Sequence, residues 1–149
     1  MAYIPNSGVG TPDANLQLCA AQAIPTDGAD DVSENIIDLI DTAPDIRGTP
    51  FKLKVKITTL IAVASGTSSK LNINLVTAST AALCTAGAGE IQKAVLTLGY
   101  NNAKGKVYEG MIAQKAPTAY SRYLGLVLEP VSDDTLYSAG AIDAWLEPA

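Results

Sequence analysis

The chain has 149 residues, of which 48% are hydrophobic and 17% charged, proportions typical of one globular domain rather than a disordered segment. Its formal net charge of −5 disfavours nucleic acid as a main partner. Its longest uninterrupted apolar run, residues 60–64, is far shorter than the roughly 20 residues of a membrane-spanning helix. We therefore expect a soluble protein, made in the cytoplasm, that binds neither nucleic acid nor membrane.

Residues 1–12 are rich in glycine and proline, with the apolar pair Tyr3 and Ile4 near the start. We interpret them as an extended N-terminal arm that precedes a single domain over residues 13–149. Within that domain, short runs typical of β-strands recur along the chain. They cover residues 35–41, 51–63, 70–77, 91–98, 106–113, 122–129 and 141–147. Residues 16–24 fit a strand or a helix, and we prefer the strand.

Clusters of glycine, proline, serine, asparagine and aspartate separate these runs and predict turns. They lie at residues 65–68, 86–89, 99–102, 116–118, 130–134 and 138–140. The glycine pairs have no phosphate-binding spacing, so we interpret them as turns too. Seven or eight strands separated in this way predict an all-β fold, an antiparallel sandwich or barrel.

The run at 51–58 alternates apolar and polar residues. Phe51, Leu53, Val55 and Ile57 would lie on one face of a strand, and Lys52, Lys54, Lys56 and Thr58 on the other. One interpretation is a solvated face or a sheet edge, where lysine discourages strand-to-strand aggregation. The other is a docking face for an acidic protein surface. Residues 1–50 hold eight acids and one base, a net −7, so that surface includes the N-terminal half of another copy.

No catalytic set is visible in the sequence. The chain contains no histidine, which removes Ser-His-Asp catalysis and the commonest zinc ligand. Cys84 has no lysine or arginine within eight positions to activate it. We interpret Cys19 and Cys84 as small buried residues, with a disulfide between them as the less favoured alternative. We predict no catalytic residue, no cofactor and no metal site.

Two acidic clusters raise the question of metal binding or of catalysis by carboxylates. The segment DGADD (27–31) has three carboxylates but lacks the order and the closing glutamate of a calcium loop. Asp133 and Asp134 follow a proline in a predicted turn. Solvated loop acids are the preferred interpretation, ahead of adventitious metal binding. An enzyme that uses carboxylates alone would need two of them paired in a cleft, which the sequence does not reveal.

Aromatic residues make up only 5% of the chain. Tyr120 and Tyr123 flank Arg122, an arrangement that favours an aromatic–guanidinium cluster. Such rings form the platform of carbohydrate-binding sandwiches, which is the alternative function for this chain. Trp145 shares a strand face with Asp143 and Glu147, and packing in the core or at an interface competes with sugar binding there.

Three segments carry a resemblance to a known family: DANLQLCAAQAI (13–24), ENIIDLIDTAPDIRGTPFKLKVKI (34–57) and SRYLGLVLEPVSDDTLYSAGAIDAWLEP (121–148). In order and spacing they resemble the small jelly-roll capsid cement (decoration) proteins of tailed bacteriophages. The shared features are an Asp-Ala start, an Ile-Asp-Leu strand, Asp-Ile before a Gly-x-Pro turn, and a late Arg-Tyr-Leu strand.

The resemblance implies an antiparallel, jelly-roll-like β-sandwich of about eight strands with an extended N-terminal arm. It further implies a non-enzymatic virion protein on the outer surface of the capsid. Such a protein forms a homo-oligomer, a dimer or a trimer, and clamps neighbouring subunits of the major capsid protein. The candidates for capsid or inter-subunit contact in this sequence are Tyr3, Ile4, Lys52, Lys54, Lys56, Tyr120 and Arg122. The alternative is a carbohydrate-binding module on a virion or host-recognition structure.

Overall fold

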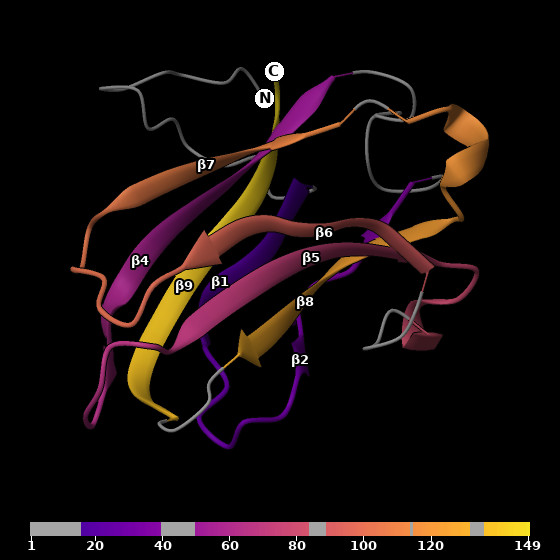
Figure 1. Cartoon of the computed structure of the whole chain (residues 1–149). Coiled ribbons are helices and arrows are strands. Elements are labelled where there is room, and N and C mark those ends of the chain that lie inside the picture. The colour runs from indigo at the N-terminus through magenta and orange to yellow at the C-terminus, as the bar shows by residue number, and fades with distance from the viewer. Residues whose placement is uncertain (1–15, 40–49, 84–88, 114, 132–135) are drawn as a thin grey trace.

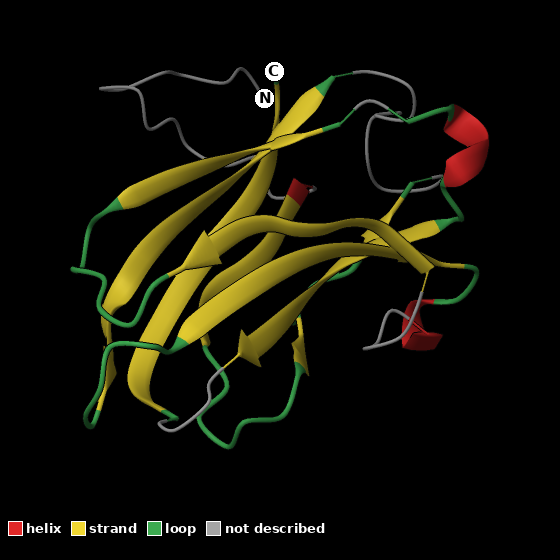
Figure 2. Cartoon of the chain, viewed as in Figure 1, coloured by secondary structure: helices red, strands yellow, loops and turns green. Residues whose placement is uncertain are grey.

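The computed structural model describes residues 16–39, 50–83, 89–113, 115–131 and 136–149. Its strands are β1 (Gln17–Ala23), β2 (Asp31–Val32), β3 (Ile37–Asp38), β4 (Phe51–Val63), β5 (Lys70–Ala78), β6 (Gly89–Leu98), β7 (Val107–Ile112), β8 (Tyr123–Val131) and β9 (Tyr137–Pro148). Two short 3₁₀ helices, η2 (Ala81–Leu83) and η3 (Pro117–Ala119), lie between strands (Figure 2). The predicted arm with Tyr3 and Ile4, together with Cys84, Asp133 and Asp134, lies outside the described residues.

The strands form two antiparallel sheets that face each other (Figure 1). The first sheet has the order β1-β9-β4-β7, and the second has the order β2-β8-β5-β6 with β3 also paired to β8. Both β2 and β3 pair with β8, one after the other along its length, so they are two halves of one interrupted strand. Eight strands in this order, crossing repeatedly between two sheets, form a jelly roll. The predicted all-β sandwich is confirmed.

The core lies between the two sheets and follows from the alternation of side chains along each strand. Leu53, Val55 and Ile57 of β4 are fully buried, and so are Leu71, Ile73 and Leu75 of β5. The opposite face of β5 carries Val76, which forms a second, smaller cluster with Ala78 and Val127. Within residues 16–24, for which a strand was preferred to a helix, Gln17–Ala23 form the strand β1.

The strand expected at residues 35–41 is wrong in its extent. Among its described residues, 35–39, only Ile37 and Asp38 are paired in a strand, and a further pair of strand residues, Asp31 and Val32, precedes them. The break is at Ser33, whose hydroxyl accepts the Leu126 amide hydrogen at 3.0 Å. Just beyond it, the Asn35 amide donates to the Leu18 carbonyl of the other sheet, so the chain leaves β8 between Ser33 and Ile37.

The start of the turn predicted at residues 130–134 and the whole of the turn predicted at 138–140 lie inside strands instead, while residues 132–134 lie outside the described part of the chain. Pro130 belongs to β8, where β2 no longer pairs with it, and an unpaired strand side tolerates a residue without an amide hydrogen. Residues 138–140 belong to β9. Gly140 has φ of +146° there, and a side chain would approach Ile61 within 2.8 Å, so this glycine serves close packing within an irregular strand.

The edge strands β1 and β6 share one irregular feature. Each contains a β-bulge with an alanine at positive φ, 48° at Ala21 and 50° at Ala94. The Ala21 amide donates to Asp143 Oδ1 at 2.6 Å, and the Ala94 amide donates to Asn74 Oδ1 at 2.7 Å. Bulges twist a sheet edge away from pairing with a foreign strand.

A glutamine next to each bulge ties the two sheets together. Gln22 Nε2 donates to the Val32 carbonyl at 2.9 Å while its Oε1 accepts the Glu34 amide hydrogen at 2.8 Å. Gln92 does the same on the opposite side of the sandwich, with the Met111 carbonyl at 3.1 Å and the Ala113 amide at 2.8 Å. Both open sides of the sandwich are therefore closed by side-chain to backbone bonds.

Ala21→Gly and Ala94→Gly should each stabilise the fold slightly. Left-handed backbone costs an alanine about 1–2 kcal/mol, and the greater freedom of glycine in the unfolded chain offsets about half of that gain. We expect a net gain of about 0.5 kcal/mol in chemical denaturation. Ala20→Gly is the matched control: Ala20 adjoins the bulge without a positive φ, so its replacement should lower stability.

Candidate functional site

The three lysines of β4 lie on the outer face of the first sheet, as the alternation predicts. The expectation of an edge strand is wrong, because β4 lies between β9 and β7. Register explains which residues meet them. Lys54 is directly opposite Glu109 of β7 and Trp145 of β9, and Lys52 is opposite Glu147. Carboxylates from both neighbouring strands therefore share the face with the ammonium groups.

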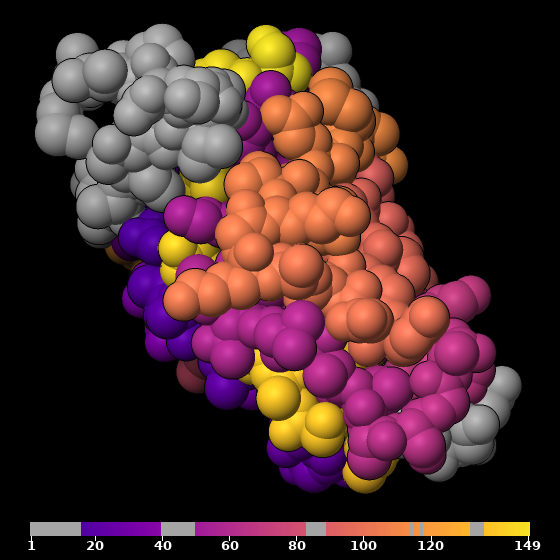
Figure 3. Space-filling view, turned by 90° about the vertical axis from the view of Figure 1, so that its left-hand side faces the viewer, coloured from indigo at the N-terminus to yellow at the C-terminus, as the bar shows by residue number. Residues whose placement is uncertain are grey.

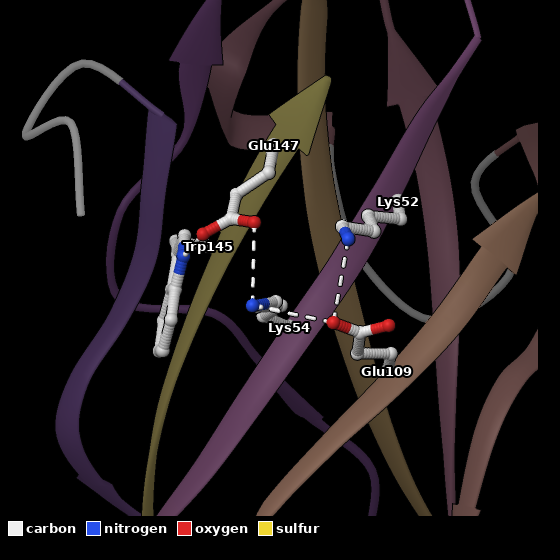
Figure 4. Close-up of polar contacts among 5 residues, drawn as sticks. All are labelled: Lys52, Lys54, Glu109, Trp145 and Glu147. Atoms are coloured by element: carbon white, nitrogen blue, oxygen red, sulfur yellow. Dashed lines mark hydrogen bonds and ion pairs between the residues drawn. The ribbon is translucent and has the colours of Figure 1, made fainter. Parts of the chain in front are cut away.

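These residues form one connected cluster (Figure 4). Lys54 Nζ lies 3.2 Å from Glu109 Oε1 and 3.5 Å from Glu147 Oε2. Lys52 Nζ lies 3.3 Å from the same Glu109 oxygen. The indole Nε1 of Trp145 donates to Glu147 Oε1 at 2.9 Å. We call Lys52, Lys54, Glu109, Trp145 and Glu147 the lysine–glutamate cluster.

Burial divides the cluster into an inner and an outer part. Lys54, Trp145 and Glu147 are all at least nine-tenths buried, whereas the Glu109 side chain is 48% exposed. Burial alone would lower the pKa of Lys54, but the hydrogen bond to Glu109 and the charge of Glu147 outweigh it and raise that pKa. The hydrogen bonds from Lys54 and Lys52 lower the pKa of Glu109. Lys54 is thus held as a cation within the fold and is not a solvated side chain.

Lys56, the third lysine, is half-buried next to Asp143 in the register. Asp143 in turn accepts the amide hydrogen of Ala21 in the β1 bulge. Lys52 and Lys56 are therefore the lysines of this face that a partner is able to reach without opening the fold. Their role in docking stays a prediction.

Of the predicted aromatic–guanidinium cluster, the structure shows the contact of Arg122 with Tyr123 and not one with Tyr120. The Arg122 guanidinium lies 5.1 Å from the centre of the Tyr123 ring. Its Nη2 lies 2.8 Å from Asp38 Oδ2 and its Nε 3.1 Å from Oδ1, a two-pronged ion pair that anchors β3 beside β8. The Arg122 side chain is still 39% exposed, so it remains accessible at the surface.

Tyr120, by contrast, belongs to the core. It is 7% exposed and its ring centre lies 6.5 Å from that of Phe51. Burial raises the pKa of its hydroxyl. Trp145 is 1% exposed, and Tyr123 is half-buried beneath Arg122. The three rings considered for sugar binding do not form an exposed platform.

The remaining candidates whose positions the structure describes form no metal-binding group. Asp27, Asp30 and Asp31 are exposed around the β1–β2 connection, and the described residues contain no group of three or more ligating side chains able to hold a metal ion. Cys19 is buried without a disulfide, and burial raises the pKa of its thiol to about 12, far from reactive. Among the residues with described structure, no helix is long and apolar enough to cross a membrane.

Sequence reasoning missed the partners of these residues. Glu109, Glu147 and Asp38 pair with basic residues far away along the chain, and only the register of the sheets brings them together. It also missed Met111, the most exposed large hydrophobic residue described, at 61%. The alternation of Tyr108, Glu109, Gly110 and Met111 predicts that Met111 points outward, but it does not predict how exposed this side chain is.

No protein-family model matches the chain, and no curated protein matches it.

Proposed function

We propose that this chain is a capsid cement protein of a tailed bacteriophage, a structural protein that binds the outer surface of the head and clamps neighbouring major capsid protein subunits. The observation that carries the proposal is the strand order β1-β9-β4-β7 over β2-β8-β5-β6. The three sequence segments that resemble cement proteins imply a jelly roll, and the strand order of the chain agrees with that implication. A shared fold alone does not establish a function, so the proposal needs a direct test.

The closed edges of the sandwich support the same function. Many copies of a cement protein would crowd together on one shell, where exposed strand edges would join copies into aggregates. The bulges at Ala21 and Ala94 and the bridges by Gln22 and Gln92 block both open sides. The body is therefore suited to attach through its surface and to remain a discrete unit.

The accessible part of the lysine face is the contact surface we favour. Lys52 and Lys56 remain reachable there, and Met111, opposite Lys52 in the register, adds exposed apolar area. A protein that binds the assembled shell better than free subunits stabilises the shell by about 2.7 kcal/mol per site when its concentration is 100 times its dissociation constant. Contacts with several subunits add avidity to that gain.

Reconstitution tests the proposal directly. Heads of the phage that encodes this chain, prepared without it, are mixed with the purified protein, and binding is measured by co-sedimentation. We expect saturable binding to mature heads, and heads that release their DNA at a higher temperature once decorated. Heads that bind no protein, or that break equally early with and without it, would rule out a cement function.

A charge reversal locates the contact. Lys56→Glu should weaken co-sedimentation with heads, because it places an acid on the favoured face while the lysine–glutamate cluster stays intact. Lys115→Glu in the exposed β7–β8 connection is the matched control and should bind as the wild type does. Thermal melting of both variants shows whether a loss of binding reflects a loss of folding. Equal binding by the two variants would move the contact elsewhere on the body.

A further inference from the structure

An open hollow lies where the end of β4 meets the loop between β6 and β7. Its volume of about 320 Å³ is near the lower end of the range of ligand pockets, about 300–1,000 Å³. Among its lining residues, Leu60 and Val63 belong to β4, Ser65 to the β4–β5 turn, and Tyr100 and Asn101 to the β6–β7 loop. In Figure 3 the magenta segment that leads from β4 into β5 lies directly beside the orange segment that joins β6 to β7.

Tyr100 differs from every other aromatic residue that the structure describes. It is 40% exposed, whereas the others are buried or half-buried. The others also use their rings or polar atoms in contacts inside the fold; they are Phe51, Tyr108, Tyr120, Tyr123, Tyr137 and Trp145. Tyr100 makes no such contact with a described residue. Its ring, at the edge of the hollow, is therefore available to a ligand.

The β6–β7 loop is held in place from inside the fold. Asn102, 5% exposed, exchanges two backbone hydrogen bonds with Ile61, each of 3.0 Å. Its side chain donates to the Gly99 carbonyl at 3.1 Å and accepts the Tyr108 hydroxyl hydrogen. The Tyr137 hydroxyl donates to the same Gly99 carbonyl at 2.8 Å. The part of the hollow that this loop forms is thus fixed before any ligand arrives, which lowers the entropic cost of binding.

The polar side chains of the hollow are neutral and free to bind. The hydroxyls of Ser65 and Tyr100 and the side-chain amide of Asn101 make no hydrogen bond to another residue that the structure describes. The two adjacent asparagines therefore differ, because Asn102 uses its amide within the fold and Asn101 does not. None of the described residues that line the hollow is charged.

This lining selects among classes of ligand. A charged ligand would meet no opposite charge in it. An apolar side chain of a protein partner would cover the three polar groups and leave them without partners, which is costly. A sugar ring has an apolar face of C–H groups and a rim of hydroxyls. Its C–H groups are attracted to the negative face of an aromatic ring, and its hydroxyls both donate and accept, as hydroxyl and amide groups of the protein do.

We propose that the hollow binds a neutral saccharide. One sugar ring stacks on Tyr100 and contacts Leu60, and its hydroxyls bond to Asn101 and Ser65. Because the hollow is open, a longer glycan continues beyond it. This site is separate from the three rings first considered for sugar binding, which form no exposed platform. The inference concerns the free protein and does not depend on the proposed function.

The test is an NMR titration of the purified full-length chain with neutral disaccharides. The probes are maltose, cellobiose, lactose and N,N′-diacetylchitobiose, which differ in their sugars and linkages. With at least one of them we expect saturable shifts of the amide signals of Ser65, Gly66 and Asn101. The dissociation constant should be about 1 mM, because an open site of this size contacts little more than one ring. No shift of these signals with any probe at about 20 mM would overturn the proposal.

Substitutions locate the site. Tyr100→Ala should raise the dissociation constant at least about fivefold, since it removes the ring on which the sugar stacks. Asn101→Ala should raise it about 2–10-fold, the effect of one neutral hydrogen bond. Met111→Ala, at an exposed residue outside the hollow, is the control and should bind as the wild type does. Thermal melting verifies that the variants fold. Equal affinity of Tyr100→Ala and the wild type would refute the site.

Co-sedimentation with phage heads separates this site from a protein contact. Tyr100→Ala should bind heads as the wild type does, because the hollow is assigned to a sugar. If the substitution abolishes binding to heads and no disaccharide shifts the amide signals, the hollow contacts the shell and the saccharide proposal is wrong. If a disaccharide binds and the wild type does not bind heads, the saccharide site stands and the cement function is rejected.

Discussion

Gly110→Ala should be strongly destabilising. Gly110 lies in β7 against the neighbouring edge strand β6, where a Cβ atom would lie 2.5 Å from the Val95 carbonyl oxygen and 2.9 Å from Val95 Cγ1. The nearer atom belongs to backbone and is not free to rotate away. Overpacking of this kind costs about 1–3 kcal/mol, and we expect the upper end of that range or more. Urea denaturation of the purified protein measures the loss.

Gly99→Ala is the matched control. Gly99 follows β6 directly, its φ is not in the left-handed region, and nothing lies within 4 Å of an added Cβ. The substitution should change stability by less than about 0.5 kcal/mol. Equal stability of the two variants would mean that β6 and β7 do not approach each other as closely as the Gly110 contact requires.

The alternation of side chains made the fold class predictable, while the pairing of strands was not. Period-2 patterns in β4 and β5 identify the faces that form the core, because such a pattern is local and physical. The pairing of Lys54 with Glu109 and Glu147 depends on register between strands that are distant along the chain. No local pattern specifies that register, so a solvated lysine face was a reasonable expectation, and it failed at the central lysine.

Irregular backbone was the other source of error. Ala21 and Ala94 occupy a conformation that usually selects glycine or asparagine, so the sequence gives no sign of the bulges. Ser33 splits a strand by binding backbone with its side chain, and Gly140 lies inside β9 although glycine usually marks a turn. In each case tertiary contacts override the local preference. Tyr100, 40% exposed, lies in a predicted turn, and the composition of a turn does not indicate an exposed aromatic side chain.

Lys54→Met should be the second strongly destabilising change. It removes the cation between Glu109 and Glu147 and leaves the Glu147 carboxylate, on a side chain 11% exposed, with the Trp145 hydrogen bond as its remaining contact among the described residues. Breaking a buried ion pair costs about 3–5 kcal/mol, and the 48% exposure of the Glu109 side chain reduces that here to about 2–3 kcal/mol. For a chain of this length the melting temperature should fall by about 5–10 °C in calorimetry.

Two further variants separate charge from packing. Lys52→Met removes only a partly exposed pair with Glu109 and should cost less than about 1 kcal/mol. Lys54→Met combined with Glu147→Gln removes both buried charges while the amide oxygen still accepts the Trp145 hydrogen bond, so most of the loss should be recovered. A double variant as unstable as Lys54→Met would show that the lysine stem, and not the unpaired carboxylate, carries the effect.

The pH dependence of the difference between wild type and Lys54→Met follows from the two pKa shifts. The raised pKa of Lys54 adds stability that is fully present below its unfolded value of about 10.4 and is lost as the pH rises through the folded value. The lowered pKa of Glu109 adds stability that is present above about 4.3 and is lost as the pH falls through its folded value. The difference should therefore be largest between about pH 5 and 9 and shrink toward both extremes. A difference that stays constant into the acidic and alkaline extremes would mean that the lysine–glutamate cluster contributes packing but no electrostatic stabilisation.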